Sequence, residues 1–166
     1  MENSNQNQTA TGSFQIQQYV VFELDNEEYA VPILDVKEVI KFSEITPVPE
    51  ALSWLSGIIN LRGKVIPVLD LEQRFQFSHE TKKRQRILVV EGEDRLPFGI
   101  LVDEVQEVLK VTQNELKAVP KVINNKISPE FVQGVIVLDK PKERILLILN
   151  LKKILSEKEI LSLEKI

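Results

Sequence analysis

The chain has 166 residues, of which 43% are hydrophobic and 28% charged, a balance typical of a folded globular domain. Its net charge of -4 argues against a nucleic-acid-binding protein, because such proteins usually carry a basic excess. The absence of cysteine excludes disulfides and thiolate metal sites, and no apolar run reaches the length of about 18 residues that a membrane-spanning helix needs.

Residues 1–13 are rich in Asn, Gln, Ser and Thr, and they contain neither a basic start nor an apolar stretch. Such a segment cannot bury enough apolar surface to offset the entropy of ordering it. We therefore expect a flexible tail without a secretory signal, followed by one domain over residues 14–166 in a cytoplasmic protein.

The first half of the domain, about residues 14–77, reads as two β-hairpins. Apolar residues alternate up to Leu24, Asp25-Asn26 supplies turn chemistry, and alternation resumes at Tyr29. The following segment, 36–40, fits either one helical turn or a bent strand. A second hairpin is predicted for residues 57–71, around the turn Arg62-Gly63-Lys64.

A polar linker over about residues 78–85 separates this half from the next. It holds the only histidine, His79, and a basic cluster formed by Lys82, Lys83, Arg84 and, just beyond it, Arg86. Basic runs of this size are usually solvated loops. The alternative is a small-barrel nucleic-acid-binding protein that uses these four cations.

The second half, about residues 86–151, repeats the first. Runs 87–91 and 98–102 restate the opening hairpin, and Val105–Lys110 repeats the pattern of Val36–Lys41. Two short β units with meagre cores predict an all-β fold of two small barrels that share a core, with a binding groove where they meet. Helical spacing then predicts a C-terminal helix over about 152–165.

Catalytic chemistry has few candidates in this sequence. His79 lies in the polar linker, and the glycines do not have the spacing of a nucleotide-binding loop. The acidic neighbours Asp103 and Glu104 would point to opposite faces of a strand. We therefore predict no catalytic, cofactor or metal site, and an enzyme using these two carboxylates stays as an alternative.

The segment GIINLRGKVIPVLDL at 57–71 and the segments 18–40 and 98–111 form an ordered set of motifs. Together they resemble the CheW family of chemotaxis coupling proteins. The first is similar to the family's signature stretch, and the other two resemble its two hairpin regions. The resemblance implies two SH3-like barrels of roughly five strands each with a C-terminal helix. It also implies a noncatalytic scaffold that links the cytoplasmic tip of methyl-accepting receptors to the regulatory domain of the histidine kinase CheA.

The resemblance further implies which residues bind the receptor or the kinase. These are Val36, Glu38, Gly57, Arg62, Gly63, Val105 and Val108. Glu38 and Arg62 could pair with each other or with a partner, whereas the valines could equally serve the core. Gly57 and Gly63 are expected to supply backbone conformations or close approaches that side chains would forbid.

The regulatory domain of CheA is a close competitor, because it has the same double-barrel form. Segment 14–166 carries no phosphotransfer, ATP-binding or receiver segment beside it, which favours a free-standing adaptor over a kinase fragment. We expect a monomer when free that assembles into arrays, with no cofactor, no nucleic acid and no direct membrane insertion.

Overall fold

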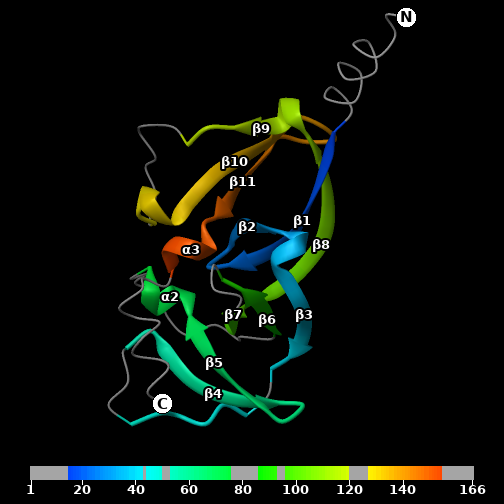
Figure 1. The fold of residues 1–166 in the computed structure, drawn as a ribbon. Helices are drawn as coiled ribbons and strands as arrows, with labels where there is room; N and C mark the ends of the chain where they lie inside the picture. The colour runs from blue at the N-terminus through cyan, green and yellow to red at the C-terminus, as the bar shows by residue number, and fades with distance from the viewer. Residues whose placement is uncertain are drawn as a thin grey trace, which may run out of the picture.

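The computed structural model describes residues 15–42, 44–49, 53–75, 86–92, 96–119 and 127–154. Most of the regular structure in these ranges is β, arranged as two sheets that form two lobes (Figure 1). This confirms the mainly-β class predicted from alternating apolar residues. None of the helices in the described ranges combines the length and apolar character needed to span a membrane.

One lobe is a six-stranded sheet in the order β8-β1-β2-β11-β10-β9. Its strands are β1 (Ile16–Leu24), β2 (Glu27–Pro32), β8 (Glu104–Thr112), β9 (Leu116–Lys117), β10 (Val132–Leu138) and β11 (Arg144–Leu149). The β1–β2 turn places Asp25 and Asn26 at φ values of 55° and 64°, as the predicted tight hairpin requires. We call this lobe the upper barrel, from its place in Figure 1.

The other lobe, the lower barrel, is a five-stranded sheet in the order β3-β6-β7-β5-β4. Its strands are β3 (Val36–Lys41), β4 (Leu55–Leu61), β5 (Lys64–Asp70), β6 (Arg86–Glu91) and β7 (Pro97–Val102). Segment 36–40, which the sequence left open, is a strand preceded by the 3-10 turn η1 (Ile33–Asp35). The two predicted hairpins of the first half are therefore confirmed.

The two sheets do not follow the two sequence halves. Each barrel takes its opening hairpin from one half and its other strands from the other half, through the parallel pairs β2–β11 and β5–β7. The strand orders of the two sheets match position by position. The lower order β3-β6-β7-β5-β4 corresponds to β8-β1-β2-β11-β10 of the upper sheet. Because each sheet contains strands from both sequence halves, hydrogen bonds between strands connect the two halves. Neither half forms a complete sheet alone.

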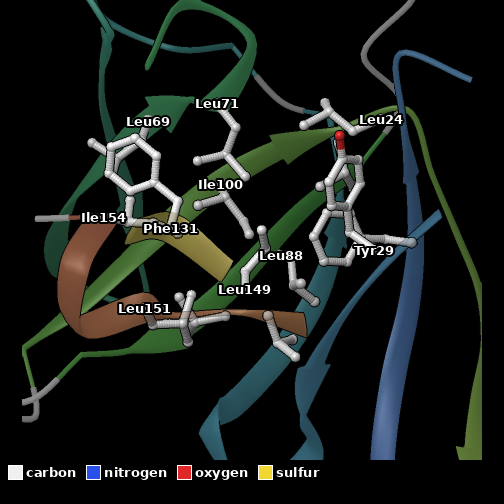
Figure 2. Packing of buried hydrophobic residues seen from close by; sticks show 14 of the residues in the cluster. Leu24, Tyr29, Leu69, Leu71, Leu88, Ile100, Phe131, Leu149, Leu151 and Ile154 are labelled. Carbon is white, nitrogen blue, oxygen red and sulfur yellow. The ribbon is translucent and has the colours of Figure 1, made fainter. Parts of the chain in front are cut away.

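The described residues form three apolar clusters. Each barrel has a small core of its own, one around Ile136 and Ile148 and the other around Ile87 and Val68. The largest cluster lies between the sheets and draws side chains from both, including Tyr29, Leu88 and Ile100 (Figure 2). The shared core predicted from the small size of each unit is therefore confirmed.

In the part of the chain that the structure describes, two short α-helices cover the shared core. Helix α2 (Leu71–Arg74) follows β5, and helix α3 (Leu151–Ile154) follows β11. Asp70 caps α2 by accepting hydrogen bonds from the Glu72 and Gln73 amides. Helix α3 begins at residue 151, and the rest of the predicted helix over 152–165, the tail 1–13 and the linker 78–85 lie outside the described residues.

Candidate partner-binding surface

The residues predicted to bind partners lie on three edge strands and in one turn, with Gly57 on β4. Val36 and Glu38 belong to β3, which ends the lower sheet, and Val105 and Val108 belong to β8, which ends the upper one. Arg62 lies in the β4–β5 turn, beside Gly63. Edge strands present unpaired backbone groups, so they are natural places for another protein to bind.

Glu38 and Arg62 form a bidentate ion pair. Arg62 Nη1 lies 2.6 Å from Glu38 Oε2, and Arg62 Nη2 lies 3.0 Å from Glu38 Oε1. The pair joins edge strand β3 to the hairpin of the opposite edge strand β4, so it links the two ends of the lower sheet. The Arg62 side chain remains 73% exposed and the Glu38 side chain 26% exposed, which leaves the guanidinium accessible to a partner.

The β4–β5 turn holds Arg62 in this position. Arg62 has a φ of 51° and Gly63 a φ of 84°, which is the left-handed pair of a tight hairpin turn. Glycine adopts such a φ without steric cost, and the Gly63 amide also donates to Asn60 Oδ1 at 2.9 Å. The turn therefore has few alternative backbone conformations, and this restricts the position of the Arg62 side chain.

Each partner of this pair favours the charged form of the other. The hydrogen bond from Arg62 lowers the pKa of Glu38, and the hydrogen bond to Glu38 raises the pKa of Arg62. Both side chains are thus ionised at neutral pH. The surface offers a partner one accessible cation backed by a carboxylate, which suits recognition of charge more than acid–base chemistry.

Gly57 takes part through its backbone only. It is buried in β4 at a φ of 149°, and a Cβ atom there would lie 2.2 Å from the Thr46 carbonyl oxygen. The Thr46 and Ile58 backbones exchange two hydrogen bonds at this point, of 3.0 and 2.9 Å. Gly57 therefore lets the 44–49 segment approach β4, and it supports the hairpin that carries Arg62.

The three predicted valines have different surroundings. Val36 and Val105 occupy equivalent places beside the bulges of β3 and β8, and both pack in part against the shared core. Val108 is 52% exposed and lies outside that core. The shared core occupies the space between the two sheets, and Val36 and Val105 lie at its edge.

The upper barrel contains a second charge cluster that the sequence analysis did not identify. Arg144 Nη2 lies 2.6 Å from Glu28 Oε2 and 3.1 Å from Glu107 Oε2, and Nε donates to Glu28 Oε1 at 3.1 Å. Glu107 is the structural equivalent of Glu38, since each follows the bulge in its edge strand. The repeat of Val36–Lys41 in Val105–Lys110 was the signal that could have pointed to it.

The residues of the alternative functions are placed as follows. Asp103 Oδ2 accepts a hydrogen bond from the Asp25 amide at 3.1 Å, which supports the β1–β2 turn, and Glu104 is exposed. Lys82, Lys83, Arg84 and His79 lie outside the described residues. Within the ranges that are described, no three His, Asp or Glu side chains gather as metal ligands.

Comparison with known proteins assigns this architecture to a family. The model of the CheW-like domain matches residues 18–159. Chemotaxis protein CheW of Thermotoga maritima is 34% identical over 82% of this chain and 85% of its own length, and that of Treponema pallidum is 31% identical over 86% and 84%. The crystal structure of the scaffolding protein TtCheW from Thermoanaerobacter tengcongensis superposes with a TM-score of 0.78, at 36% identity over 87% of this chain and 96% of that one.

Proposed function

Because the chain belongs to the CheW-like family, we propose that it is a noncatalytic cytoplasmic adaptor that couples methyl-accepting chemoreceptors to the histidine kinase CheA. The observation that supports this most directly is the accessible Glu38–Arg62 pair, which stands on a sheet edge inside the matched domain. In this role the protein lets the state of the receptor control autophosphorylation of the kinase.

The two barrels offer two distinct surfaces for two partners. The lower barrel presents the charged pair at β3 and its neighbouring turn, and the upper barrel presents the half-exposed Val108 on β8. An ion pair at the rim of an interface mainly supplies specificity, whereas exposed apolar side chains supply contact area. Modest affinity at each surface is enough when many copies assemble into an array.

The charge of Arg62 provides the sharpest test. Arg62→Glu places a second carboxylate beside Glu38 and removes the accessible cation, so we expect receptor-dependent kinase activity to fall by about 10-fold. Lys64→Glu is the matched control, since Lys64 is an exposed cation at the end of the same turn. The measurement is autophosphorylation of CheA mixed with a receptor signalling fragment and the purified variant.

Binding to each partner alone separates the two surfaces. The Arg62→Glu and Lys64→Glu proteins are titrated separately against the receptor fragment and against the kinase regulatory domain, with circular dichroism as a check of the fold. Selective loss of one partner in Arg62→Glu would identify the partner of the lower barrel. Wild-type coupling in this variant, or an equal loss in both variants, would contradict the assignment of Arg62.

A further inference from the structure

The last residue of α2, Arg74, lies between two aromatic rings. Its guanidinium carbon is 5.3 Å from the centroid of the Trp54 ring and 5.0 Å from that of Phe131. Its Nε–H also donates to the carbonyl oxygen of Ile154, at 2.9 Å. The Arg74 side chain thus combines cation–π contacts with a hydrogen bond to the backbone.

These contacts connect the two barrels. Trp54 immediately precedes β4 of the lower barrel, whereas Phe131 ends η3 (Pro129–Phe131) and immediately precedes β10 of the upper one. The two rings hold equivalent positions, because the Asp70 amide donates to the Trp54 carbonyl and the Asn150 amide donates to the Phe131 carbonyl, both at 2.8 Å. Arg74 therefore bridges matching points of the two lobes.

The same correspondence shows where the duplication has diverged. Helices α2 and α3 follow equivalent strands, so the counterpart of Arg74 in the upper barrel is Ile154. The guanidinium of one helix thus bonds to the Ile154 backbone carbonyl of the other. Figure 2 shows Ile154 and Phe131 together at the end of the shared core, close to α3.

The chemistry of these contacts differs from that of the core beneath them. Apolar burial holds the two sheets together, but it is non-directional and specifies their angle weakly. A planar guanidinium between two rings, with one N–H committed to a carbonyl, restricts rotation as well as separation. Helix α2, with four residues, is also too short to be stable without such tertiary contacts.

We propose that Arg74 is a positioning residue that fixes the orientation of the upper barrel relative to the lower barrel. Through this orientation it sets the relative positions of the β3 edge and the β8 edge. The importance of these relative edge positions for binding two partners rests on the proposed function.

The orientation can be measured in the free protein. The chain has no cysteine, so Val65→Cys and Ile145→Cys introduce one spin-label site on the hairpin of each barrel, at positions that are 64% and 59% exposed. Double electron–electron resonance then gives the distance distribution between the barrels. In this background we expect Arg74→Met to shift and broaden the distribution, and Arg74→Lys to do so less, because lysine keeps the charge without the planar fork.

Lys153→Met is the matched control, because Lys153 is an exposed cation on α3 and the substitution makes the same change of charge. It should leave the distribution unchanged. Trp54 is the only tryptophan of the chain. Its fluorescence emission maximum should shift to longer wavelength in Arg74→Met, because the indole gains access to water, but not in Lys153→Met. An unchanged distribution in a folded Arg74→Met protein would overturn the proposal, and if that variant does not fold, an unchanged distribution in Arg74→Lys would do so.

Kinase assays with the same variants separate this inference from the proposed function. If the orientation matters for coupling, a variant with an altered distribution should lose about 2- to 30-fold of the receptor-dependent kinase activity. An altered distribution with full coupling would leave Arg74 as the orienting residue and count against its consequence for the adaptor role. An unaltered distribution would reject the positioning role whatever the kinase assay shows.

Discussion

The hairpins of the two barrels differ in how each holds its arginine. In the lower barrel Arg62 lies in the turn, pairs with Glu38 and keeps 73% of its side chain exposed. In the upper barrel Arg144 lies at the start of β11, pairs with two carboxylates and is only 19% exposed. The two arginines lie on equivalent hairpins, β4–β5 and β10–β11. Each pairs with the equivalent glutamate of an edge strand, Glu38 on β3 or Glu107 on β8.

This difference shows how equivalent charge pairs in a duplicated scaffold can take different roles, one available for binding a partner and the other stabilising the fold. An exposed ion pair contributes little to stability and can rearrange, because water and salt screen it. A partly buried arginine bonded to two carboxylates is more costly to remove than an exposed one, because both carboxylates lose their hydrogen-bond donor. We therefore expect the lower pair to serve binding and the upper cluster to serve closure of its barrel.

The largest expected effect concerns the equivalent glycines of the two barrels. In Gly57→Ala the new Cβ would meet the Thr46 carbonyl at 2.2 Å, at a φ that alanine rarely adopts, so we expect a loss of more than about 3 kcal/mol in unfolding free energy. In Gly134→Ala the nearest atom, the Lys117 carbonyl oxygen, lies at 3.4 Å, and we expect less than about 1 kcal/mol. Urea denaturation measures both, and equal losses would show that the 44–49 segment yields more readily than its geometry suggests.

The two arginines give an intermediate effect. Arg144→Met leaves Glu28 and Glu107 without their shared partner, so we expect the protein to lose about 1 to 2 kcal/mol of unfolding free energy. Arg62→Met should hardly change the urea midpoint, because this side chain is mostly solvated. A larger shift for Arg62→Met than for Arg144→Met would reverse the roles that we assign to the two pairs.

The smallest effect is on the titration of Glu38. The hydrogen bond from Arg62 lowers its pKa below the ordinary glutamate value of 4.5, so the pair stabilises the folded state above that pH and loses its contribution as the pH falls through the folded-state pKa. Carboxyl-detected NMR should give a lower midpoint for Glu38 in the wild type than in Arg62→Met. Identical midpoints would mean that the ion pair does not persist in solution.

Local patterns in the sequence were enough to predict most of the β structure. Alternating apolar residues located the hairpins, Asp25-Asn26 and Arg62-Gly63 located tight turns, and the repeated Val36–Lys41 pattern indicated duplication. These features are readable because they depend on neighbours in the chain, through backbone sterics and the two-residue period of a strand. The sequence allowed Glu38 and Arg62 to pair with each other or with a partner, and the structure shows the contact between the two side chains.

Contacts between distant segments were decided only by the tertiary structure. The exchange of hairpins between barrels and the bridge from Arg74 to Trp54 and Phe131 have no signature in any short stretch of sequence, and the repeat that marks Glu107 does not identify Arg144 as its partner. Each depends on which sheet edges and helix ends meet, and that is set by packing of the shared core as a whole. The amino-acid sequence therefore determined the β-hairpins and their repetition in the two halves. Three-dimensional packing determined which hairpin completes which barrel and which charged side chains stay accessible to a partner.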